Sequence, residues 1–70
     1  MFIEVEENRF INVTSINEIM IDRTYKTVTF QLPGGEVIES KFGKVGEFLI
    51  YVEDVLKAIS KADDIKKYEA

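Results

Sequence analysis

The chain has 70 residues, of which 46% are hydrophobic, and it contains no Cys and no His; its formal net charge is −4. One domain of this length has neither disulfides nor thiolate zinc sites, so packing or self-association must stabilise it. The negative charge opposes broad non-specific binding of nucleic acid, and without His or Cys the usual general base and the best nucleophile are missing. We therefore expect no enzyme, no catalytic residue, no cofactor and no metal ion.

The location of the protein is predicted from what its segments lack. No stretch approaches the roughly 20 continuous apolar residues of a membrane helix. The first ten residues carry acidic side chains where a signal peptide needs basic ones. We expect a cytoplasmic or intraviral protein without membrane insertion.

Residues 2–13 are predicted to form a β-hairpin. Its buried face would be aliphatic, consisting of Ile3, Val5, Ile11 and Val13. A loop over residues 7–9 would set Val5 opposite Ile11 and bring all four side chains to one face. Asn8 would then occupy a loop position that requires a positive φ.

The middle of the chain predicts further strands at residues 16–22 and 27–32. β-Branched and aromatic residues alternate with polar ones, most clearly in the second of these segments. Pairing Asp22 with Thr27 would close a short loop and place Ile19 opposite Phe30.

The run "QLPGGEVIES" predicts a hairpin turn followed by a strand over residues 36–41. A loop over residues 34–36 would use its glycines at positive φ and set Leu32 opposite Ile38. Val37 would then point outward. The spacing and the missing helix exclude a phosphate-binding P-loop at these glycines.

After Gly43 the apolar residues follow helical spacing. The predicted apolar stripe consists of Val45, Phe48, Leu49, Val52, Val55, Leu56 and Ile59. The helix would cover about 44–60, with continuation to 67, a new turn from Ser60 and Asp63, or fraying of 61–70 as alternatives.

These elements predict an α+β fold and a single domain over residues 1–70. The fold would be a four-stranded antiparallel β-meander covered on one face by the C-terminal helix. Its strands would lie at about 2–6, at 10–13 or on to 22 with a break, at 27–32 and at 36–41.

Residues 10–40 carry a loose pattern of an aromatic, an Asn, alternating strands and a Gly turn. The matching residues are Phe10, Asn12, Ile16, Ile19, Thr27, Val28, Leu32, Gly35 and Ser40. In these positions the chain resembles the small flagellar-operon FlbD (SwrD) family, which implies a flagellar accessory protein. The chain departs from that family in its first hairpin, in the segment "DRTYKT" and in its long polar C-terminus.

The apolar residues that the fold leaves outside predict a contact surface. Five candidates lie on the outer strand face or beside it: Phe10, Tyr25, Thr27, Thr29 and Val37. The first hypothesis is a non-enzymatic protein-interaction module, with self-association into a homodimer through this face or an edge strand as one form. In the alternative, Phe10 and Tyr25 only cover the rim of the sheet.

Charged residues supply the remaining hypotheses. A local basic patch consists of Arg23, Lys26, Lys41 and Lys44, which would suit a small nucleic-acid-binding regulator of bacterial or phage type. A carboxylate enzyme would need Glu4 and Glu6, or Glu36 and Glu39, in a pocket, and solvated charges are the favoured interpretation. The pair Asp63 and Asp64 lacks the spacing of an EF-hand.

Overall fold

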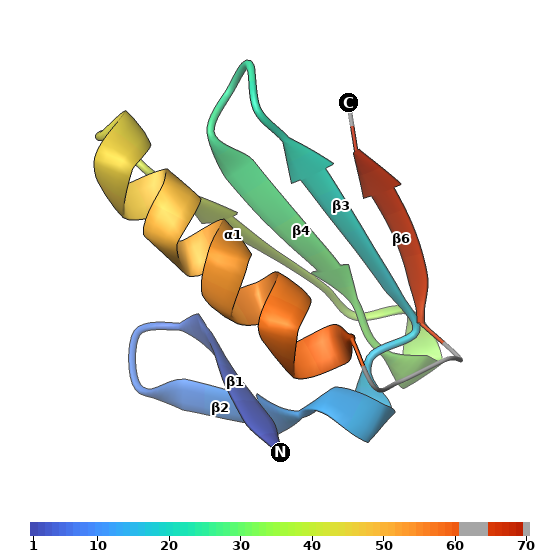
Figure 1. The fold of residues 1–70 in the computed structure, drawn as a ribbon. Coiled ribbons are helices and arrows are strands. Elements are labelled where there is room, and N and C mark those ends of the chain that lie inside the picture. Colours follow the sequence, from blue (N-terminus) through green and yellow to red (C-terminus); the bar gives the residue numbers. More distant parts are fainter. Residues whose placement is uncertain (61–64, 70) are drawn as a thin grey trace.

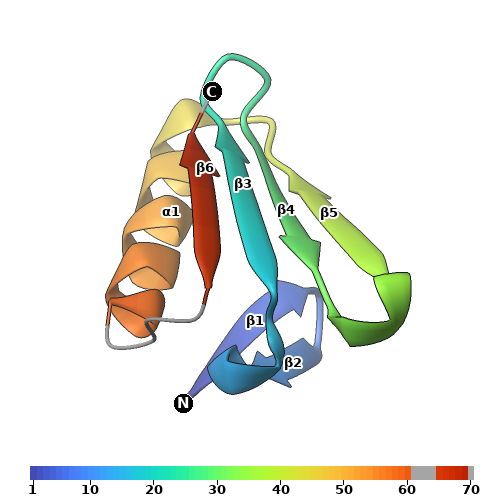
Figure 2. The ribbon, with the colours of Figure 1, turned by 90° about the vertical axis from the view of Figure 1, so that its right-hand side faces the viewer.

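The structure, a computed structural model, describes residues 1–60 and 65–69 and has the predicted α+β architecture (Figure 1). Its elements in chain order are β1 Phe2–Glu6, β2 Arg9–Asn12, the 3-10 turn η1 Val13–Ser15, β3 Glu18–Asp22, β4 Thr27–Gln31, the turn η2 Pro33–Gly35, β5 Val37–Lys41, α1 Val45–Ile59 and β6 Lys66–Glu69. The strands form a β1-β2 hairpin and a four-stranded sheet of order β5-β4-β3-β6. Helix α1 lies across one face of the larger sheet, and the hairpin closes one end of the two layers (Figures 1 and 2).

The predicted single antiparallel meander is wrong at its first strands. Strands β1 and β2 form a sheet of their own, because the chain turns away at η1 before β3 begins. Asn12 stabilises this turn, since its side-chain oxygen accepts a hydrogen bond from the backbone N–H of Thr14 at 3.1 Å. The break expected near Thr14 is therefore a change of sheet and not an irregularity within one strand.

The meander is also wrong at its last strand, because β6 pairs with β3 in parallel and makes the larger sheet mixed. Helix α1 returns the chain to the end of the sheet at which β3 starts, so the strand that follows runs in the same direction as β3. Residues 66–69 were expected to be helical or frayed and are a strand. The expected capping box at Asp63 and the acidic pair there lie outside the described residues.

The β3–β4 register is confirmed, with Asp22 opposite Thr27 and Ile19 opposite Phe30. The register of β4 with β5 is shifted by two residues from the prediction, because Phe30 and not Leu32 lies opposite Ile38. Side chains alternate with a period of two, so a shift of two residues changes the partner but not the face.

The turn between β4 and β5 is longer than expected. It runs from Leu32, whose N–H donates to the carbonyl of Glu36 at 2.8 Å. Its glycines have the predicted positive φ, 87° at Gly34 and 90° at Gly35. Ile38 is buried and Val37 is exposed, as expected.

The first hairpin combines a two-residue turn with a β-bulge, whereas a three-residue loop was predicted. Glu6 lies opposite Arg9, and the register shifts between Glu4 and Glu6. The extra residue of the bulge is Val5, and it allows Ile3 to face Ile11 despite the short turn. Asn8 has the predicted positive φ, at 61°.

The predicted position of helix α1 is confirmed, but the stripe of side chains that it buries is rotated relative to the predicted stripe. Val45 and Leu49 are 62% and 48% exposed, and Tyr51 and Ala58 pack against the core in addition to the expected residues. The rotation has a physical cause, because α1 covers the sheet and also contacts β1 of the hairpin. No helix in the described ranges has the length and hydropathy required to span a membrane.

Candidate functional site

The face of the larger sheet that points away from α1 is the candidate functional surface. Side chains of a strand alternate between faces, and the residues buried toward α1 include Ile19, Ile21, Val28, Phe30 and Ile38. The alternate residues form what we call the outer sheet face: Glu18, Met20, Asp22, Thr27, Thr29, Gln31, Val37, Glu39, Lys41, Lys66 and Tyr68.

The middle of the outer sheet face is uncharged and largely apolar on β6, β3 and β4, and Glu39 of β5 ends this central row. The strand registers place Tyr68, Met20 and Thr29 side by side on three neighbouring strands. Val37 stands on β5 in the adjacent row, next to Gln31. Met20, Tyr68 and Val37 are 46%, 47% and 58% exposed, so three large apolar side chains contact solvent on one surface.

Charges of both signs surround this centre. Lys66 pairs in register with Glu18 at one end of the strands, and Thr27 separates Asp22 from Lys41 at the other end. An uncharged centre within a polar margin is the arrangement found at protein–protein interfaces.

The structure brings together three of the five predicted contact residues. Thr27, Thr29 and Val37 lie on the outer sheet face, where both threonines are half-buried. Tyr25 lies in the loop between β3 and β4 and is 66% exposed. Phe10 is 60% exposed but belongs to β2 of the separate hairpin, so its expected place on the common sheet is wrong.

Two residues of the outer sheet face, Met20 and Tyr68, were missed by sequence reasoning. Met20 could have been found, because the predicted inward positions of Ile19 and Ile21 require the residue between them to point outward. Tyr68 carried no such signal, because its segment has no apolar alternation and was expected to be helical or frayed.

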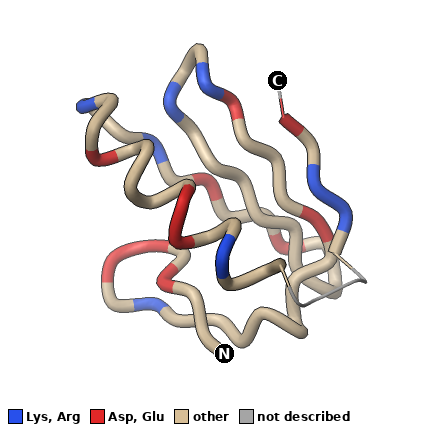
Figure 3. Tube along the Cα trace, viewed as in Figure 1, with Lys and Arg blue, Asp and Glu red and all other residues tan. Residues whose placement is uncertain are grey.

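The predicted basic patch gathers at one end of the molecule. Figure 3 shows Lys and Arg in the loop between β3 and β4 and in the segment that leads into α1, and these lie at the same end. The N–H of Phe42 donates to the carbonyl of Lys26 at 2.9 Å, which brings the backbone of Lys26 next to the end of β5. The patch is partly neutralised, because Arg23 forms an ion pair with Glu69 at 2.8 Å.

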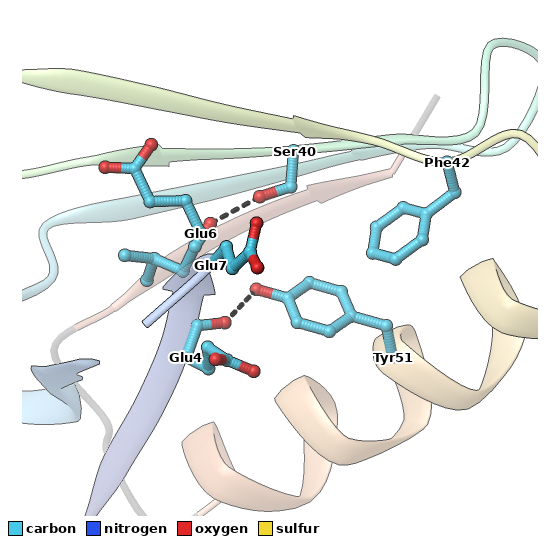
Figure 4. A pocket seen from close by; sticks show the side chains of 7 residues that line it. Glu4, Glu6, Glu7, Ser40, Phe42 and Tyr51 are labelled. Atoms are coloured by element: carbon cyan, nitrogen blue, oxygen red, sulfur yellow. Dashed lines mark hydrogen bonds between the residues drawn. The ribbon is translucent and has the colours of Figure 1, made fainter. Parts of the chain in front are cut away.

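A hollow lies between β1, β5 and α1. It has a volume of about 210 Å³ and is lined by Glu4, Val5, Glu6, Glu7, Ser40, Phe42 and Tyr51. Two hydroxyl groups point into it from different elements (Figure 4). The Tyr51 hydroxyl donates to the carbonyl of Glu4, and the Ser40 hydroxyl donates to the carbonyl of Val5.

The electrostatics of this hollow keep Tyr51 neutral. Burial raises the pKa of Tyr51 to about 12; the Ser40 hydroxyl acts in the opposite direction, and the charge of Glu4 adds a smaller increase. A tyrosine with this pKa holds its proton at neutral pH and acts as a hydrogen-bond donor. Both hydroxyls therefore supply donors to backbone carbonyls of β1, which has β2 as its one paired strand among the described residues.

The other charged candidates remain on the surface. Glu36 accepts hydrogen bonds from Arg9, which lowers the pKa of its carboxyl group, and Arg9 also pairs with Glu6. Within residues 1–60 and 65–69, no group of three or more His, Cys, Asp and Glu side chains could hold a metal ion.

Comparison with protein-family models, with curated proteins and with solved structures finds no match. The resemblance to the FlbD family therefore stays a prediction.

Proposed function

We propose that the protein is a small protein-interaction module that binds a partner protein through the outer sheet face. The supporting observation is the exposure of Met20, Tyr68 and Val37 on a sheet whose opposite face is already covered by α1. Several large apolar side chains exposed on one face of a small domain are typical of an interaction site. A flagellar accessory protein would be one specific form of such a module.

The side chains of the outer sheet face indicate what kind of surface the partner presents. Met20 is unbranched and adaptable, and Tyr68 offers a flat ring with a polar tip, so the centre suits an apolar surface on the partner. The threonines of β4 add hydroxyl groups without charge. The margin carries Lys66, Glu18 and Asp22, so the partner needs charges of both signs around its apolar centre.

Site-specific crosslinking tests this proposal. A photo-reactive amino acid at position 20 should crosslink the protein to a partner in cells, and one at position 50 should not. Ile50 is a matched control, because it is 65% exposed on α1. Met20→Glu should abolish the product obtained with the crosslinker at position 37. Equal crosslinking from positions 20 and 50, or an unchanged product with Met20→Glu, would contradict the proposal.

A nucleic-acid-binding regulator is the second candidate, supported by the strand register and the backbone hydrogen bond that bring Lys26 and Lys41 to the same end of the sheet. Binding through these lysines would weaken steeply with salt, because phosphate contacts release counterions. A gel shift at low salt that is lost in Lys26→Ala/Lys41→Ala would support this candidate. A negative gel shift with the wild-type protein would remove it.

A further inference from the structure

The two edges of the larger sheet differ in what covers them. Strand β5 has the hairpin packed against it, since β1 contacts β5 and the hydroxyl of Ser40 donates to the carbonyl of Val5. Strand β6 has β3 on one side and no neighbour among the described residues on the other, and all four of its side chains are exposed. Strand β6 therefore offers unpaired backbone groups to another strand.

The direction of these backbone groups follows from one hydrogen bond. The N–H of Lys66 donates to the carbonyl of Asn17 at 3.2 Å, which directs the backbone groups of Lys66 toward β3. Successive residues of a strand direct their N–H and C=O groups to alternate sides, so Tyr68 also faces β3. The N–H and C=O groups of Lys67 and Glu69 consequently point to the open side.

We propose that β6 pairs antiparallel with β6 of a second copy of this chain, about a two-fold axis at Tyr68. In this register Lys67 lies opposite Glu69 of the second copy, and by symmetry the same pair forms twice. These are the residues whose backbone groups point outward, so each pair exchanges both of its backbone hydrogen bonds.

Charge favours this register over the one whose two-fold axis passes through Lys67. Side chains opposite one another must share a face, so the axis has to pass through a residue and not between two residues. An axis at Lys67 would place Lys67 against its own copy, and like charges directly opposite each other are destabilising. The axis at Tyr68 replaces that repulsion with two attractions and sets two tyrosine rings at the close spacing of a non-hydrogen-bonded pair.

This inference goes beyond the proposed function, because it uses the edge of the sheet and not its face. Lysines on an edge strand oppose random strand addition. Here they also favour a partner strand that carries an acidic residue two positions after a lysine, which β6 itself does. Pairing would join the two sheets into one and place two outer sheet faces side by side.

Reciprocal charge reversal tests the register. Sedimentation velocity of the wild-type protein should show a dimer that forms with rising concentration. Lys67→Glu and Glu69→Lys should each weaken dimerisation by about tenfold or more, because two attractions become two repulsions. An equimolar mixture of the two variants should dimerise again, because each Glu then faces a Lys.

The controls separate this dimer from other effects. Lys44→Glu makes the same change of net charge away from β6 and should leave dimerisation unchanged. Val37→Glu disrupts the outer sheet face on β5 and should also leave the dimer intact, so failure of the proposed function and failure of the dimer are distinguishable. Amide hydrogen exchange of Lys67 and Glu69 should slow with rising protein concentration. A wild-type monomer at about 1 mM, or a mixture that stays monomeric, would overturn the proposal.

Discussion

The two edges of the larger sheet show two ways in which a small chain can treat unpaired backbone groups. At the β5 edge, the hairpin packs against the sheet, and the hydroxyls of Ser40 and Tyr51 donate to carbonyls of its strand β1. At the β6 edge, the described residues leave the backbone open and place charged side chains of both signs beside it. The β5 edge, here called the closed edge, is therefore stabilised by buried apolar area and by two hydrogen bonds between neutral groups. At the β6 edge, here called the open edge, charge decides which strand can pair with the backbone.

The largest expected effect is at the closed edge. Val5 is fully buried at the bulge of β1, so Val5→Ala should lower the free energy of unfolding by about 2 kcal/mol. Urea unfolding followed by circular dichroism measures the change. Val37→Ala is the matched control, because the same two carbons are removed from a side chain that is 58% exposed; it should change stability by about 0.5 kcal/mol or less. Equal effects at both positions would show that the hairpin does not close this edge.

A smaller effect is expected when the hydroxyl of Tyr51 is removed. Tyr51→Phe keeps the ring packing against Phe30 and Phe42 and leaves the carbonyl of Glu4 without its donor. The cost should be about 1 kcal/mol at neutral pH, as for a typical intramolecular hydrogen bond. Tyr25→Phe is the control, because it removes the same hydroxyl from a ring that is 66% exposed.

The raised pKa of Tyr51 also predicts how the stability of the protein changes at alkaline pH. Its pKa in the folded protein is raised to about 12 from its ordinary value of 10.0, so the native state holds this proton more tightly than the unfolded state. Stability from this group is complete below about pH 10 and falls as the pH rises toward 12. The decline should be shallower in Tyr51→Phe. The same slope in both proteins would contradict the role given to the hydroxyl.

The sequence predicts the centre of this fold better than its ends. Alternation in β3 and β4 determines which residues are buried, and it gave the correct face even for β5, where the register was shifted by two. The same alternation identified Thr27, Thr29 and Val37 as outward residues. Period-two patterns are local, and they report the face of a strand without naming its neighbours.

The predictions for the two ends of the chain were wrong because the structure there depends on contacts between segments far apart in the sequence. The bulge at Val5 and the division of the strands into two sheets are set by pairing between strands, which no local pattern records. Strand β6 is exposed on both faces, so its segment Lys66–Glu69 needs no apolar alternation and shows none. Candidate residues on a two-sided polar edge, such as Tyr68, are therefore the hardest to predict.

The smallest change in stability is expected from two surface ion pairs, one near each edge of the larger sheet. Arg9 lies on the hairpin and pairs with Glu36 beyond the β4–β5 turn at 2.8 Å, while Arg23 pairs with Glu69 of β6 at the same distance. All four side chains are well exposed, so Arg9→Ala and Arg23→Ala should each shift the urea midpoint only slightly, and the shift should vanish at high salt. Arg9 lowers the pKa of Glu36, so its contribution is present at neutral pH and is lost as the pH falls through the acid range. A salt-resistant loss in Arg9→Ala as large as that in Val5→Ala would mean that charge, and not apolar burial, closes the β5 edge.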